Sequence, residues 1–140
     1  MATKIVVDTS VFISSLIGPS GPSREVVRRS LQGKFFPLMG TTLFCEYESV
    51  MGRDSILTQC PLSQAEILAL TQAFLSVCHW IDIFYLWRPN LRDEGDNHLI
   101  ELAIAGNADV LVTNNIKDFR NTELAFPHLK ILSPTELIRS

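Results

Sequence analysis

Acidic side chains stand in this sequence where a parallel α/β fold would bring them to one edge of a sheet. Asp8 directly follows the β-branched run 5–7, and Thr113 directly follows the apolar run 110–112, with Asp118 five residues later. In a parallel sheet, the carboxyl ends of both strands would face one crevice. The remaining candidate acids are Asp93, Glu94 and Asp96, ahead of the apolar segment 99–105, and Glu46 and Glu48, within the segment 43–51.

Such a group of carboxylates predicts a site for divalent cations. Carboxylates that converge on one crevice repel each other, and their pKa values rise unless a cation neutralises them. Oxygen ligands without suitably spaced His or Cys side chains favour Mg²⁺ or Mn²⁺ over zinc. One or two such ions can turn a bound water into hydroxide and stabilise a leaving oxygen. A site of this kind can support metal-assisted hydrolysis without a protein nucleophile.

Each acid also has an ordinary structural explanation. Asp8 could cap the helix that follows it, and the acids before Leu99 could satisfy backbone amides at a helix N-terminus. Glu46 and Glu48 each lie on a flank of the apolar stripe of their helix, so periodicity does not choose between them.

The histidines His79, His98 and His128 show no ligand-like spacing, and none is assigned a role. His98 is the least easily dismissed of the three because it lies close to Asp96. The cysteines are odd in number and form no Cys-x-x-Cys pair, which argues against a disulfide framework and against a thiolate metal site.

The charge balance limits how the chain could bind a polyanion. Twelve Lys and Arg stand against 15 Asp and Glu, a formal net charge of −3, which argues against general electrostatic capture of nucleic acid. The densest basic segment contains Arg24, Arg28, Arg29 and Lys34. A solvated helix face would explain this segment, but if the crevice binds nucleic acid, these side chains are the expected phosphate contacts.

Apolar periodicity and capping patterns predict strands that alternate with helices. We expect strands at 5–7, 35–39, 80–84, 110–112 and 130–132. We expect helices at 9–16 with Thr9 or Ser10 as the cap, at 23–31, at 43–51 with Thr41 or Thr42 as the cap, from the capping box Ser63–Glu66 to about Cys78, at 96–105, and from Pro134 onward.

This alternation predicts an α/β fold, a three-layer α/β/α sandwich with a mainly parallel sheet. The 140 residues are expected to form a single domain, residues 1–140. No apolar run resembles a signal peptide or approaches the length of a membrane span, so we expect a soluble, cytoplasmic protein that does not contact membranes.

Four segments together resemble the PIN domain family, and more narrowly the VapC-like ribonuclease toxins of type II toxin-antitoxin systems. They are 5–11, the segment 46–53 with Glu46-Tyr47, 93–96, and Leu-Val-Thr-Asn-Asn-Ile-Lys-Asp-Phe at 111–119. The resemblance implies a PIN-like fold over nearly the whole chain. It also implies that Asp8, Glu46, Asp96 and Asp118 are the site acids and that Asp93 is a further metal ligand.

The same resemblance implies a substrate and partners. The expected activity is metal-dependent endoribonuclease cleavage of RNA, with a cognate antitoxin as the inhibitor and a homodimer as the assembly. Thr113 and Asn115 match a segment in which a hydroxyl and a polar side chain hold substrate, water or a neighbouring acid. Thr9 and Ser10, next to Asp8, and the basic Arg24 and Arg28 complete the expected substrate contacts.

Two alternatives stay open. One is a binding module with the PIN fold that has lost its metal, since many relatives carry Asp where this chain has Asn115. The other is a metal-dependent phosphatase, which would need a second Asp two residues after Asp8, where this chain has Ser10.

Overall fold

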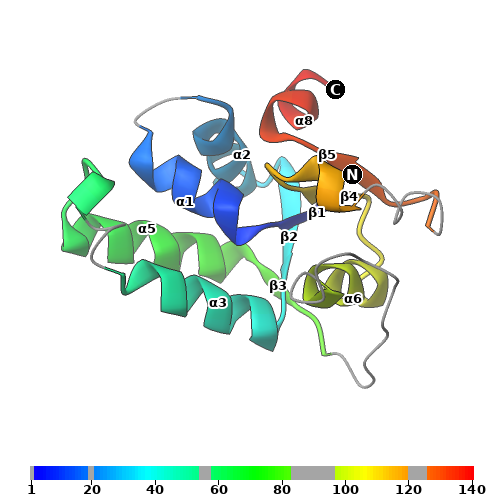
Figure 1. Cartoon of the computed structure of the whole chain (residues 1–140), viewed down its shortest axis with the longest axis horizontal. Coiled ribbons are helices and arrows are strands. Elements are labelled where there is room, and N and C mark those ends of the chain that lie inside the picture. The colour runs from blue at the N-terminus through cyan, green and yellow to red at the C-terminus, as the bar shows by residue number, and fades with distance from the viewer. Residues whose placement is uncertain (1, 19–20, 54–57, 83–96, 120–125) are drawn as a thin grey trace.

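A computed structural model describes residues 2–18, 21–53, 58–82, 97–119 and 126–140 of the chain (Figure 1). Asp93, Glu94 and Asp96, three of the acids named above, lie outside the described residues. Asp96, the predicted first residue of the helix 96–105, is among them, and the described part of that helix begins at Asn97.

Among the described residues, five parallel strands form the sheet, in the spatial order β3-β2-β1-β4-β5. They are β1 (Thr3–Val7), β2 (Phe35–Met39), β3 (His79–Trp80), β4 (Val110–Val112) and β5 (Lys130–Leu132). The central strand β1 is flanked by β2 and β4, and Val7 is paired in register with Val112. Parallel neighbours require crossover connections, and helices supply them here.

The helices cover both faces of this sheet. They are α1 (Thr9–Ile17), α2 (Pro22–Leu31), α3 (Thr41–Met51), α5 (Gln64–Val77), α6 (Asn97–Ala105) and α8 (Pro134–Arg139), together with the 3-10 turn η2 (Ile116–Phe119). Figure 1 shows α2 and α8 on one side of the sheet and α6 on the other. The predicted three-layer α/β/α sandwich with a parallel sheet is confirmed. No helix in the described ranges is long and apolar enough to cross a bilayer.

The core lies between the sheet and these helices. The last three residues of β1, Ile5, Val6 and Val7, and all of β4 are buried, as expected for a central parallel strand covered on both faces. Phe12 of α1 stacks on Tyr47 of α3 with ring centroids 4.9 Å apart. These contacts hold the first turn of α1 and the middle of α3 next to the carboxyl end of β1.

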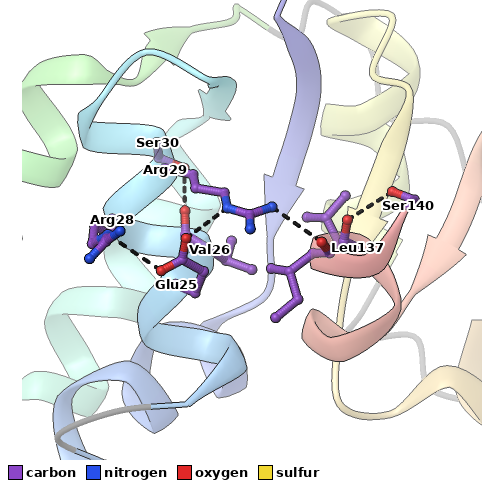
Figure 2. Close-up of polar contacts among 8 residues, drawn as sticks. Glu25, Val26, Arg28, Arg29, Ser30, Leu137 and Ser140 are labelled. Atoms are coloured by element: carbon purple, nitrogen blue, oxygen red, sulfur yellow. Dashed lines mark hydrogen bonds and ion pairs between the residues drawn. The ribbon is translucent and has the colours of Figure 1, made fainter.

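Polar contacts also tie α2 to α8. Arg29 bonds the Glu25 carboxylate through Nε at 2.7 Å and the backbone oxygen of Ile138 through Nη1 at 3.3 Å (Figure 2). Glu25 also pairs with Arg28 at 3.4 Å. The pKa of the Glu25 carboxyl is lowered, chiefly by the hydrogen bond from Arg29. Burial raises this pKa, and the positive charges of Arg28 and Arg29 lower it further.

Several predicted boundaries were wrong. The N-cap of α1 is Asp8 rather than Thr9 or Ser10, and the N-cap of α3 is Gly40 rather than Thr41 or Thr42. The predicted strand 80–84 begins at His79 and ends at Trp80 within the described residues, because only this pair is in register with β2. The capping box at Ser63 and Glu66 is confirmed.

Candidate functional site

Asp8 lies at the carboxyl end of the central strand β1. Its backbone N–H donates to the carbonyl oxygen of Val112 at 3.0 Å, so the ends of β1 and β4 are in direct contact. The residue that follows β4 is Thr113, which is fully buried. The parallel register therefore brings together two side chains that are 105 residues apart in the sequence, as the pattern predicted.

Asp8 is 6% exposed as a residue, and its carboxylate accepts hydrogen bonds from two hydroxyls. Thr113 Oγ1 donates to Asp8 Oδ2 at 2.8 Å, and Ser10 Oγ donates to the same oxygen at 3.3 Å. Although Asp8 occupies the N-cap position of α1, its side chain makes no capping hydrogen bond. A helix cap needs no partner 105 residues away, so capping alone does not account for the hydrogen bond between Asp8 and Thr113.

The environment of Asp8 disfavours its charge. Burial is the main reason that the pKa of this carboxyl is raised above its usual value, because an ion loses hydration there. The hydrogen bond from Thr113 partly lowers the pKa, and the nearby negative charge of Glu46 raises it again. A raised carboxyl pKa in an open crevice is a feature of functional sites.

Glu46 is the acid of α3 that faces this crevice. Its Oε1 accepts a 2.6 Å hydrogen bond from Thr9 Oγ1, and its Oε2 lies 2.9 Å from His98 Nε2. Glu48 is exposed and lines a different groove, between α3 and α5. Helical periodicity did not choose between Glu46 and Glu48. Tertiary packing places Glu46, and not Glu48, in the crevice with Asp8.

These side chains line an open crevice of about 480 Å³. Polar groups dominate its lining, which combines the start of α1, the middle of α3 and the segment after β4. The lining residues are Asp8, Thr9, Ser10, Ile13, Ser14, Glu46, Val50, Asn114, Asn115 and Asp118. Six side chains predicted from the sequence therefore share one cavity: Asp8, Thr9, Ser10, Glu46, Asn115 and Asp118.

Thr113 differs from the other predicted residues in the site. Its hydroxyl donates to Asp8 and accepts a 3.0 Å hydrogen bond from the backbone N–H of Asn115. Because Thr113 is fully buried, it orients a neighbouring acid, which is one of the roles expected for this segment.

The predicted basic contacts lie outside the lining of the crevice. Arg24 Nε donates to the backbone oxygens of Ser15 at 3.1 Å and Gly18 at 3.0 Å, which connects the end of α1 to α2. Arg28 is two-thirds exposed and pairs with Glu25. Contact of Arg24 and Arg28 with substrate stays a prediction, and Arg24 has a structural role that the sequence did not indicate.

His98 is the site residue that sequence analysis missed. It lies in the first turn of α6, and its side chain is only 12% exposed. The available signal was its position two residues after Asp96, but its spacing from the other histidines suggested no function.

The oxygen donors of the crevice suit a hard divalent cation. The described residues contribute the carboxylates of Asp8, Glu46 and Asp118 to its lining. Both hydroxyl donors of Asp8 bond Oδ2, so neither occupies Oδ1. A cation would also offset the burial and repulsion that raise the pKa of Asp8. Within the described ranges, no three His, Cys, Asp or Glu side chains are grouped closely enough to hold a metal by themselves. A metal in this crevice would therefore need further ligands, and the predicted acids Asp93 and Asp96 lie outside the described residues.

Comparisons with known proteins agree with this architecture. A family model described as PIN domain matches residues 4–117. No curated protein matches the chain. One similar solved structure is the crystal structure of VapBC2 from Rickettsia felis bound to a DNA fragment from their promoter, with a TM-score of 0.64 and 17% sequence identity. That similarity covers 94% of this chain and 98% of the solved one, and at this identity it shows the fold.

Proposed function

The chain belongs to the PIN domain family, and from this premise we propose that it is a metal-dependent endoribonuclease that hydrolyses RNA phosphodiester bonds. PIN domains are generally nucleases. The observation that carries the proposal is the convergence of Asp8 and Glu46 on one crevice at the carboxyl edge of a parallel sheet. This edge is where α/β folds bind their ligands.

Asp8, Asp93, Asp96 and Asp118 would hold one or two Mg²⁺ or Mn²⁺ ions, with Glu46 as the helix-borne acid of the site. A bound ion would supply hydroxide at neutral pH and stabilise the leaving 3′-oxygen. The hydroxyls of Thr113 and Ser10 hold the Asp8 carboxylate in place. Asn115, which lines the crevice, would contact the RNA backbone.

We further propose that the chain is the toxin of a type II toxin-antitoxin module, with a cognate antitoxin protein as its inhibitor. The support is the family together with the fold shared with VapBC2. Assembly as a homodimer stays a prediction. Expression of the wild-type chain is expected to arrest bacterial growth, whereas an Asp8→Asn variant should not. Arrest by both proteins would contradict a toxic nuclease activity.

Cleavage of a mixed RNA pool tests the nuclease proposal directly. Purified protein should cut RNA with Mn²⁺ or Mg²⁺ and lose that activity in EDTA. Asp8→Asn should abolish cleavage, while Asp109→Asn provides a matched control. Asp109 is exposed, lies before the amino end of β4 and accepts a hydrogen bond from the Lys4 backbone.

The two alternatives make different predictions for the same protein. A binding module without metal would neither cut RNA nor bind Mn²⁺ in calorimetry, even after removal of any copurified antitoxin. A phosphatase would hydrolyse phosphate monoesters instead of RNA. The Ser10 hydroxyl hydrogen-bonds Asp8 where that mechanism would require a second acid, which disfavours the phosphatase.

A further inference from the structure

The Glu46 carboxylate is held from two sides by side chains of two different helices. Thr9, in the first turn of α1, donates to Oε1 at 2.6 Å. His98, in the first turn of α6, lies 2.9 Å from Oε2. Each oxygen of one carboxylate therefore has its own partner, and these partners are 37 and 52 residues from Glu46 in the sequence.

The His98 side chain is more deeply buried than the side chains of an ordinary surface ion pair. Its side chain is 12% exposed, whereas that of Glu46 is 38% exposed and open to the crevice. An ionised carboxylate can only accept hydrogen bonds, so this contact requires the hydrogen of the neutral His98 ring to be on Nε2. The other ring nitrogen, Nδ1, is buried and has no hydrogen-bond partner among the described residues. The only hydrogen bond of the ring within the described structure is therefore to Glu46.

An unsupported Glu46 would not stay near Asp8. The negative charge of Glu46 contributes to the raised pKa of Asp8, so the two carboxylates repel each other. A glutamate side chain has several rotatable bonds and could relieve this repulsion by turning toward solvent. The two donors oppose that movement, and they do so before any cation arrives.

We propose that His98, together with Thr9, is a positioning residue that orients Glu46 toward Asp8 for binding of a divalent cation. This inference rests on the proposed metal-dependent function. A carboxylate has about four lone-pair sites, so two donors leave others free for a cation. Metal-binding carboxylates commonly have such hydrogen-bond partners, and loss of one typically weakens metal affinity or activity by about 10–100-fold.

Calorimetric titration of Mn²⁺ into His98 variants tests the proposal without relying on activity. His98→Ala removes the donor to Glu46 and should weaken Mn²⁺ binding by about 10–100-fold. His98→Gln should recover much of this loss, because the Gln amide N–H reaches nearly as far as Nε2. The matched control is His128→Ala, since His128 is exposed in a turn. Thermal unfolding in EDTA checks that each variant is folded.

The outcomes separate this inference from the proposed function. Wild-type protein that binds no Mn²⁺ would contradict the proposed function and this inference together. Wild-type protein that binds Mn²⁺, with folded His98→Ala binding equally well, would overturn the inference alone. Loss of binding in both His98→Ala and His98→Gln, without rescue, would also overturn a role that depends on a donated hydrogen bond.

The hydrogen bond itself can be measured in metal-free protein. Nitrogen-15 NMR of the histidine rings distinguishes a hydrogen on Nε2 from one on Nδ1, and the His98→Gln variant identifies the signal. We expect the His98 hydrogen on Nε2. A ring with its hydrogen on Nδ1 alone could not donate to Glu46 and would overturn the proposal.

Discussion

The Tyr47 hydroxyl donates a 2.7 Å hydrogen bond to the backbone oxygen of Val7. Val7 is the last residue of β1 and Tyr47 follows Glu46 in α3, so this bond links the two chain segments that carry the crevice acids. Tyr47 is 1% exposed and its pKa is raised, chiefly by burial. The position of Tyr47 in the aromatic core therefore helps to set the distance between Asp8 and Glu46.

Replacement of Tyr47 by Phe should lower both stability and metal affinity. The variant keeps the stacking on Phe12 but loses a buried hydrogen bond and leaves the Val7 oxygen without this donor. The expected cost is about 1–3 kcal/mol of unfolding free energy. Urea unfolding and Mn²⁺ titration measure the two effects, and unchanged stability would show that this hydrogen bond contributes nothing.

Replacement of Thr113 by Val should raise the pKa of Asp8 further. The wild-type hydroxyl donates to the charged form of Asp8 and thereby lowers a pKa that burial raises. Its loss removes that opposing effect, so Asp8 must be deprotonated at a higher pH. The acidic limb of the pH–cleavage profile should therefore move to higher pH. An unmoved limb would mean that a group other than Asp8 controls it.

Replacement of Asp8 by Asn should stabilise the metal-free protein at neutral pH. The pKa of Asp8 in the folded protein is raised above its ordinary value of 3.8. The folded chain therefore binds more protons than the unfolded chain between those two pKa values, and stability falls as pH rises through this window. In EDTA at pH 7, Asp8→Asn should unfold a few degrees higher than wild type.

Added Mn²⁺ should reverse this order, because ligand binding stabilises only a folded protein that binds it. Wild type should gain stability and Asp8→Asn should not. Asp109→Asn again serves as the control, and its melting temperature should follow that of wild type under both conditions. A metal-free Asp8→Asn variant that is less stable than wild type would contradict the assigned cost of burying Asp8.

Replacement of Gly106 by Ala should destabilise the fold, because α6 ends in close contact with β2. A Cβ atom there would lie 2.5 Å from Leu38 Cδ1 and 3.1 Å from Ile81 Cγ1. Overpacking of this kind costs about 1–3 kcal/mol. Gly52→Ala is the matched control, since its Cβ would meet only backbone atoms at ordinary distances of 3.7 Å or more. Equal melting temperatures for the two variants would contradict the packing at Gly106.

Replacement of Arg28 by Gln tests the predicted phosphate contact. Arg28 is exposed and pairs only with Glu25 in the described structure, and such a pair is worth little to stability. The variant should melt like wild type but show a raised KM for RNA and a salt dependence of binding reduced by about one phosphate contact. Arg139→Gln, at the exposed end of α8, is the control. An unchanged KM would remove Arg28 from the substrate site.

The sequence by itself determined the alternation of strands and helices and the meeting of Asp8 with Thr113. These features depend on residues that are close together in the sequence, as in the apolar runs 5–7 and 110–112 and in the capping box at Ser63. A parallel sheet then places the carboxyl ends of neighbouring strands together. Boundaries were less predictable, since the extent of β3 depends on its register with β2.

Only the tertiary structure decided what helical periodicity and local sequence patterns left open at the site. Glu46 and Glu48 are equivalent by helical periodicity, yet only Glu46 reaches Thr9 and His98. No local sequence pattern pointed to His98, because its partner Glu46 lies 52 residues away on another helix. Arg24, whose contact with phosphate stays a prediction, also bonds two carbonyl oxygens at the end of α1 through Nε, which the sequence did not indicate. Such contacts depend on how the helices pack on the sheet, and local sequence patterns do not record that packing.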